Sequence, residues 1–192
     1  MNTSDSFEIK NKRAKKMMLW IGMISMSMTF AGLTSAYVVS SSRADWLEQI
    51  SLPTAFSIST LIIILSSISF HWAKHYFEKQ QFKNSQILLL STLFLATLFI
   101  YFQFKGCSEI IEMGYYFTGP QSSINTSYLY VLVLLHLAHL TAGFVVVLRL
   151  LYLSSVVKNT TKHTLGFELA VTFWHFLDLL WVYLFLFVSF YS

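Results

Sequence analysis

The sequence predicts an all-α, polytopic membrane protein built as a bundle of five transmembrane helices. Hydrophobic residues make up 55% of the 192 residues and charged residues only 11%, whereas a soluble domain carries roughly 25% charge. Most of the charges lie in short clusters between long apolar stretches. This is the layout of a protein that crosses a membrane several times, and it excludes a soluble globular domain.

Five apolar stretches are long enough to span a membrane, since a helix needs roughly 20 apolar residues to cross about 30 Å of hydrocarbon. Each is too continuous for a β-barrel strand, whose signal is about 10 residues of alternating polarity. We expect a cytoplasmic N-terminal tail over residues 1–16 and one membrane domain over 17–192, with spans at about 17–41, 54–75, 86–104, 128–153 and 165–190.

The first span follows five basic residues of the tail, a feature that it shares with secretory signal peptides. A signal peptide has an apolar core of only about 7 to 15 residues, and the stretch after Lys16 is about two dozen residues long. We therefore expect it to stay in the membrane. Aromatic residues near the ends of spans are typical of interfacial or lipid-facing positions; here they are Trp20, Tyr37, Trp46 and Tyr183 to Tyr191.

Small residues mark the middle spans. The second span carries serines that we interpret as allowing close helix approach and bonding back to their own helix: Ser57, Ser59, Ser66, Ser67 and Ser69. The third span leads into the longest predicted loop, 105–127, which holds the turn residues Gly106, Gly114, Gly119 and Pro120. Gly143 in the fourth span is typical of a close-packing position.

The basic residues are distributed unevenly between the two sides of the membrane. Eleven fall on the side of the N-terminus, in the tail, in 74–83 and in 149–162, and only Arg43 and Lys105 fall on the other side. This bias predicts a cytoplasmic N-terminus and an outside C-terminus. It also accounts for the net charge of +4, so we expect no nucleic-acid partner.

Cys107 is the only cysteine. The chain therefore has no intrachain disulfide, no four-thiolate cluster, no CxxCH haem attachment and no two-cysteine copper site.

Ionisable residues inside the bilayer are functional candidates, because a charge at the bilayer centre costs at least ~2.5 to 3.5 kcal/mol. The candidates are Glu168, His175 and Asp178 in the fifth span, His136 and His139 in the fourth, and His71 and His75 at the end of the second. Asp178 and Glu168 lie near one helix face with His175. We expect that face to point into protein.

Three interpretations of these residues stay open. In the one that we favour, the histidines and carboxylates hydrogen-bond one another between helices and contact lipid headgroups. In the second, His139 and His175 face each other as axial haem ligands, since both lie some 15 Å from a membrane surface. In the third, Glu168 and Asp178 form a proton or ion pathway. A serine hydrolase is disfavoured because the sequence has no Gly-x-Ser-x-Gly elbow.

The string Phe-Trp-His-Phe-Leu-Asp-Leu-Leu-Trp (173–181), with Glu168 upstream, resembles the last-helix signature of haem-copper oxidase subunit III. The segment His136-Leu-Ala-His139-Leu-Thr-Ala-Gly143 resembles that family's His-x-x-His-x-x-x-Gly pattern. Weaker similarities lie in the serines of span two, in Gln103 with Gly106, and in the loop 114–119, and the resemblance runs from about residue 18 to 191.

The resemblance implies a short, five-helix bacterial form that is a multi-pass protein of the bacterial cytoplasmic (inner) membrane. It implies an accessory subunit of a respiratory oxygen reductase, most simply a cytochrome c oxidase, that packs on subunit I beside subunit II and other subunits, holds phospholipid, and supports proton uptake and stability. Haem and copper would belong to the partner subunits and not to this chain. The oxygen-reducing reaction would be that of the complex.

The resemblance also implies which residues form a lipid-contacting or interhelical polar network: His136, His139, Glu168, Trp174, His175, Asp178 and Trp181. One position departs from the family, since Met26 stands where a carboxylate usually follows a serine in span one. The alternatives are a quinol oxidase subunit III, a membrane cytochrome b using His139 and His175, and a small transporter, which the absence of inverted repeats disfavours.

Overall fold

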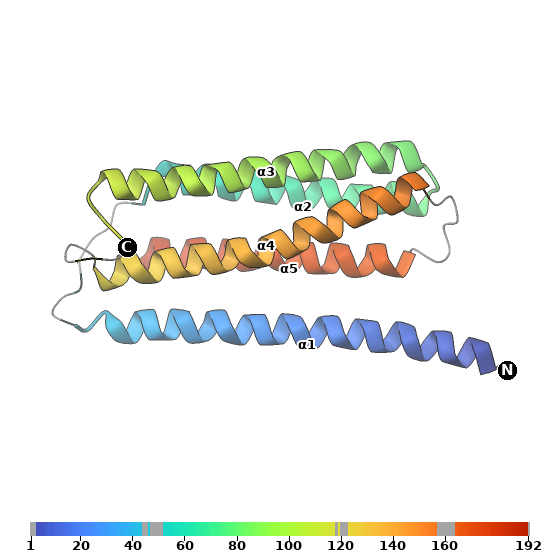
Figure 1. The fold of residues 1–192 in the computed structure, drawn as a ribbon, viewed down its shortest axis with the longest axis horizontal. Coiled ribbons are helices and arrows are strands. Elements are labelled where there is room, and N and C mark those ends of the chain that lie inside the picture. Colours follow the sequence, from blue (N-terminus) through green and yellow to red (C-terminus); the bar gives the residue numbers. More distant parts are fainter. Residues whose placement is uncertain are drawn as a thin grey trace.

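The computed structural model describes residues 3–43, 46, 52–117, 119, 123–156 and 164–191. Over these residues the chain forms five helices: α1 (Thr3–Ser40), α2 (Thr54–Glu78), α3 (Phe82–Glu112), α4 (Ile124–Val156) and α5 (Thr164–Tyr191). All five are long and apolar enough to cross a membrane. The predicted fold class is confirmed (Figure 1).

All five helices are longer than the predicted spans, and α1 and α3 exceed them most. Helix α1 begins at Thr3, so nearly all of the expected tail 1–16 is helical. Helix α3 continues to Glu112, and the predicted loop 105–127 is reduced to residues 113–123. The polar residues from Lys105 to Glu112 suggested a loop, but they lie on α3, which continues past the apolar span. Hydropathy indicates where a helix leaves the membrane, and the backbone hydrogen bonds of the helix can continue beyond that point.

Helices α2 and α3 end in the same kind of cap. After α2, Gln80 takes a positive φ of 61°, and the backbone N–H of Gln81 donates to Tyr76 O while that of Gln80 donates to Phe77 O. Gly114, at φ 89°, holds the equivalent position after α3. This is the Schellman arrangement, which satisfies the last carbonyls of a helix. The cap after α2 leaves a connection so short that α2 and α3 must lie antiparallel as neighbours.

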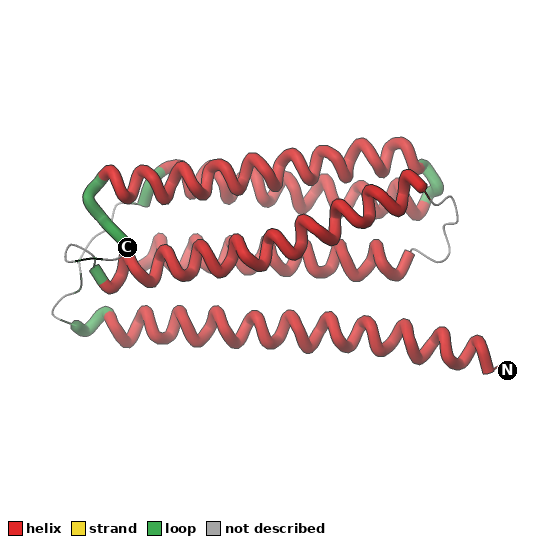
Figure 2. Tube along the Cα trace, in the orientation of Figure 1, coloured by secondary structure: helices red, strands yellow, loops and turns green. Residues whose placement is uncertain are grey.

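Helices α2, α3, α4 and α5 form a four-helix bundle in which each helix packs against two others, and α1 lies outside it against α4 and α5. Figure 1 shows the resulting layers, with α1 on one side, α4 and α5 in the middle and α2 and α3 on the other side. The N-terminal end of α1, the turn after α2 and the C-terminal end of α4 all lie at one end of the molecule (Figure 2). The basic residues assigned above to the N-terminal side of the membrane lie at this end, except Lys158 and Lys162, which lie outside the described residues. Thr118 and Pro120 of the predicted loop also lie outside the described residues.

Aromatic packing joins α1 to the bundle at the opposite end. Tyr37 is only 1% exposed, and its ring lies 4.8 Å from that of Trp46 and 5.5 Å from that of Phe187. Of the two positions expected for Tyr37, interfacial or lipid-facing, its burial excludes the lipid-facing one. A residue near the end of a span can be buried when a neighbouring helix covers it, and α5 does so here.

Candidate functional site

Helix α5 turns one face toward the bundle interior, and that face carries Trp174, Asp178 and Trp181. These positions are four and three residues apart, so they lie on one side of a helix. The three side chains are almost fully buried, and Asp178 is only 4% exposed. The interior of the bundle is thus partly polar.

Trp181 connects α5 to three other helices. Its Nε1 donates a 3.1 Å hydrogen bond to Thr60 Oγ1 of α2, and the Thr60 hydroxyl donates in turn to Phe56 O. The indole ring also lies 5.1 Å from the ring of His136 and 5.3 Å from that of Phe99. Trp181 therefore fixes α5 against α2, α3 and α4 at once.

His136 is enclosed between these aromatic rings and has no exposed surface. Within the described part of the chain, neither of its ring nitrogens has a hydrogen-bond partner. The same holds for both oxygens of Asp178 and for the indole nitrogen of Trp174. These three side chains concentrate unbonded polar atoms in an apolar bundle.

Trp174 packs where α4 and α5 are in tight contact at Gly143. A Cβ built on Gly143 of α4 would lie 2.9 Å from Leu177 Cδ1 and 3.3 Å from the Trp174 ring. The predicted role of Gly143 as a close-packing residue is confirmed. On its other side the Trp174 ring meets that of Phe70 at 5.8 Å.

His175 lies at the junction of α5 and α2, where it is partly exposed. Its Nδ1 is 2.5 Å from Ser67 Oγ, at hydrogen-bond distance, and its ring centre is 5.9 Å from that of His71. Ser67 also lies close to Asp178. The pairing of Ser67 with His175 was not predicted, because it depends on how α2 and α5 are rotated about their axes.

Other serines of α2 bond across to α3. Gln103 Nε2 donates to Ser59 Oγ at 2.9 Å, Ser69 Oγ donates to Leu88 O at 3.1 Å, and Ser85 of α3 donates to Ala73 O at 2.8 Å. Ser59 also bonds back to Phe56 O, as the sequence predicted. The bonds between helices were not predicted, and they hold α2 and α3 together along much of their length.

His139 faces away from the bundle interior. Its Nδ1 donates to Leu135 O at 2.7 Å, and its ring lies 5.7 Å from that of Phe30 on α1. His139 and His175 therefore contact opposite neighbours, α1 and α2, and do not face each other as two axial haem ligands would. Across the described residues, no group of three or more histidine, cysteine or acidic side chains is arranged to hold a metal ion.

Glu168 lies near the beginning of α5, where it pairs with Lys16 of α1 at 2.7 Å. The two side chains are 44% and 45% exposed. Asp178 lies ten residues further along, about 15 Å along the helix axis. The two acids thus have separate surroundings, although the sequence suggested one common face with His175.

The seven residues predicted as a site form no hydrogen bonds with one another in the described part of the chain. Their partners are Thr60, Ser67, Lys16 and the backbone of α4. Four of them (His136, Trp174, Asp178 and Trp181) are buried in the bundle. His175 is half-buried between α5 and α2, and His139 and Glu168 lie where the bundle contacts α1.

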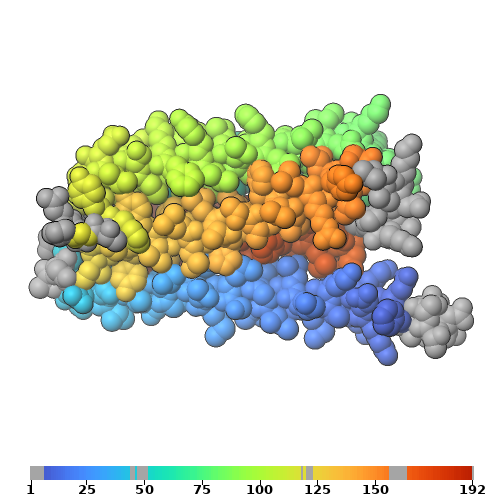
Figure 3. Space-filling model, viewed as in Figure 1, coloured from blue at the N-terminus to red at the C-terminus, as the bar shows by residue number. Residues whose placement is uncertain are grey.

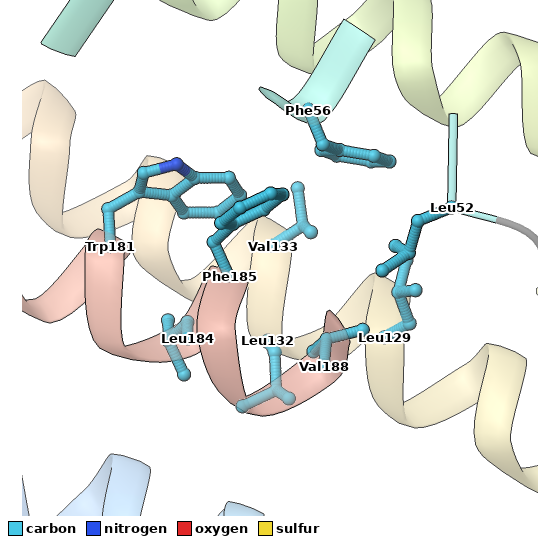
Figure 4. Close-up of a pocket in the computed structure, with 9 residues that line it drawn as sticks. All are labelled: Leu52, Phe56, Leu129, Leu132, Val133, Trp181, Leu184, Phe185 and Val188. Atoms are coloured by element: carbon cyan, nitrogen blue, oxygen red, sulfur yellow. The ribbon is translucent and has the colours of Figure 1, made fainter. Parts of the chain in front are cut away.

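A small apolar pocket of about 20 Å³ lies beside Trp181 (Figure 4). Only apolar side chains line it, contributed by α2, α4, α5 and the segment before α2: Leu52, Phe56, Leu129, Leu132, Val133, Trp181, Leu184, Phe185 and Val188. Its volume is close to the minimum that holds one water molecule, but it offers no polar partner for one.

Comparison with known proteins identifies the relatives of this bundle. The family model for cytochrome c oxidase subunit III matches residues 15–192. This chain belongs to the cytochrome c oxidase subunit III family. The match covers the four-helix bundle and α1 from Lys15 onward, so the resemblance drawn from the motifs of α4 and α5 is confirmed.

Two bacterial relatives match this subunit III chain over most of their own length. It is 26% identical to the cytochrome bo(3) ubiquinol oxidase subunit 3 of Buchnera aphidicola, over 98% of this chain and 92% of the relative. It is 24% identical to the cytochrome c oxidase subunit 3 of Bacillus sp. PS3, over 86% and 80%. This chain has five helices that could span a membrane, and these relatives are subunits of bacterial oxidases. Together the two findings confirm an accessory oxidase subunit of the bacterial inner membrane.

Proposed function

We propose that this chain is the subunit III of a cytochrome c oxidase that packs directly on subunit I, holds phospholipid, and supports proton uptake and stability. Haem and copper would be bound by its partner subunits. One observation carries the proposal. The motif side chains of α4 and α5 contact other helices of this chain, and the described residues form no group of ligands for a metal ion.

The outer surface supports a role in packing. The outward faces of α2 and α3 are apolar over much of their length, with Leu61, Ile64, Leu65, Ile68, Trp72, Leu90 and Phe94 all exposed. Exposed apolar area of this extent suits acyl chains or another membrane subunit. In lipid, such association depends on packing and hydrogen bonds between helices.

Proton uptake would have to use groups other than a carboxylate at position 26 of α1. Met26 occupies the position where the family usually has one and is partly buried, while the neighbouring Ser25 is exposed. A thioether cannot exchange a proton. Position 26 therefore takes no part in the proton uptake that we propose this chain to support.

The experiment is affinity purification from the membrane in a mild detergent through a tag on the N-terminus, followed by mass spectrometry and an absorption spectrum. We expect a haem-copper subunit to co-purify and the haem to be lost when the tagged chain is stripped from it. A solitary chain that itself absorbs as a haem protein would contradict the proposal.

A quinol oxidase is the second candidate, because the relative matched over 92% of its length is named as a ubiquinol oxidase subunit. The purified complex distinguishes the two. Oxidation of reduced cytochrome c with no oxidation of ubiquinol supports the first candidate, and the reverse supports the second.

A further inference from the structure

A strip of polar side chains lies on the outer surface where α2 meets α5, and the proposed function gives this surface no role. Its members are Ser67, His71 and Lys74 of α2 and His175 of α5. His71 is exposed and the other three are partly exposed. His175 connects the strip, since it contacts Ser67 and the ring of His71 and lies close to Lys74. Figure 3 shows the side formed by α3, α4 and α1, from which little of α2 and α5 is visible.

The two histidines of the strip lie within the hydrocarbon layer. The middle of α5, which extends from Thr164 to Tyr191, is about 4 Å from His175 at 1.5 Å per residue. Ser67 is next to the middle residue of α2, and His71 lies about 8 Å from that middle. Half of the hydrocarbon layer is about 15 Å thick, so both imidazoles are inside it.

The strip interrupts a surface that is otherwise suited to lipid. Ionisable residues at this depth almost always face protein or a water-filled cavity. Among the described residues, the imidazole of His71 has no hydrogen-bond partner, and its one ring contact is with His175. The neighbouring outward side chains of α2 and α5 are apolar and exposed, among them Ile68, Trp72 and Leu179. A polar interruption in such a surface indicates that another protein segment covers it.

The strip presents hydrogen-bond donors and positive charge. An ammonium group is a donor only, and an imidazole donates through one or both of its nitrogens. Among the described carboxylates, only that of Glu78 pairs with a member of the strip, Lys74, at 3.7 Å. Asp178, which is close to Ser67, is buried inside the bundle. A carboxylate from outside this chain is the complement of such a surface, because charge-assisted hydrogen bonds are the strong ones.

A lipid headgroup cannot supply this anion. The edge of the hydrocarbon layer is about 7 Å from His71 and about 11 Å from His175 along the helix axes, and headgroups lie beyond that edge. A helix that crosses the bilayer can place a side chain at any depth. Such a helix would also associate with α2 and α5 through packing and hydrogen bonds, as helices do in lipid.

We propose that the strip binds a transmembrane helix of another subunit that carries an aspartate or a glutamate at the level of His71 and His175. The carboxylate accepts hydrogen bonds from the two imidazoles, and Ile68, Trp72 and Leu179 pack against the same helix. The inference rests on the proposed function, because it needs an oxidase complex, and it adds the face of the contact and the chemistry of the partner.

The first test is photocrosslinking in the native membrane. The photoreactive residue p-benzoylphenylalanine replaces Leu179, one helical turn from His175, and in a matched control it replaces Phe94 on α3. Both positions are 69% exposed. After irradiation the tagged chain is purified, and the crosslinked peptide is sequenced by mass spectrometry. We expect position 179 to capture an apolar segment of another subunit that contains an acidic residue, and position 94 not to capture that segment.

The second test measures how strongly the captured subunit is held in detergent. We expect the double variant His71→Leu, His175→Leu to retain it about fivefold less well, from the loss of two hydrogen bonds between helices. Changing the acidic residue of the captured helix to alanine gives a similar loss, and the two changes together add little. The control His75→Leu retains the subunit, because His75 is exposed three residues before the end of α2. Circular dichroism verifies that each variant is helical.

Three results would overturn this inference and leave the proposed function in place. Position 179 could capture only lipid or a second copy of this chain, the captured helix could hold no acidic residue, or the double variant could retain the subunit as well as the natural chain does. Each result is obtained with a preparation that still contains a haem-copper subunit and its haem spectrum. If the natural chain co-purifies with no oxidase subunit, the proposed function fails as well.

Discussion

The indole Nε1 of Trp181 donates a 3.1 Å hydrogen bond to Thr60 Oγ1, and this bond ties α5 to α2 inside the bundle. Both residues are at least nine-tenths buried. An indole N–H that loses its acceptor in such a place has no water to replace it. The pair is therefore the most direct place to measure how polar contacts stabilise this subunit.

Replacing either partner should lower the free energy of unfolding, and the two effects should not add. We expect Thr60→Val to cost about 1 to 3 kcal/mol, because it leaves the indole N–H buried without an acceptor. A cycle with Trp181→Phe should give a coupling of about 0.6 kcal/mol, the average for hydrogen bonds between membrane helices. Unfolding in mixed micelles with increasing sodium dodecyl sulfate measures all four forms. A coupling of zero would mean that the bond contributes nothing to stability.

Gly143→Ala should destabilise the bundle, and Gly32→Ala should not. The added methyl group at Gly143 would lie 2.9 Å from Leu177 Cδ1, whereas nothing lies within 4 Å of one at Gly32. Overpacking costs about 1 to 3 kcal/mol, while alanine in an open helical position gains up to about 1 kcal/mol over glycine. The same unfolding measurement compares the two variants. Equal effects would contradict the close approach of α4 and α5.

His175→Ala should loosen the assembled oxidase and leave its haem content per haem-copper subunit unchanged. The substitution removes the partner of Ser67 and the ring beside His71, both of which are contacts within this chain. Co-purification yield and the haem absorption spectrum are the two measurements, and His75→Ala, at an exposed position on α2, is the control. Loss of haem with the assembly intact would support the haem-ligand interpretation instead.

Glu168→Gln should change stability little, despite the position of Glu168 in the predicted fifth span. The pair with Lys16 is nearly half exposed, and exposed ion pairs contribute about 0 to 1 kcal/mol. We expect a loss within that range, smaller still at high salt, and recovery in the exchange Lys16→Glu with Glu168→Lys. A loss above about 3 kcal/mol would indicate a carboxylate buried in the membrane.

The number of helices and their order follow from the sequence, since each span is a long apolar stretch and the backbone in lipid must bond to itself. The family likewise follows from short strings in α4 and α5. The sequence alone was enough to recognise these strings, and it also predicted the close-packing role of Gly143. These features depend on local composition and spacing, which the chain carries directly.

Only the tertiary structure decided which way each side chain points. His136 enters the bundle and His139 faces α1, although one helical turn separates them. Ser67 meets His175, and Glu168 meets Lys16 rather than the other acid. In a soluble protein the polar face of a helix would reveal such orientations. In a bilayer the surroundings are as apolar as the interior, so the rotation of each helix is set by its neighbours and leaves little periodic trace in the sequence.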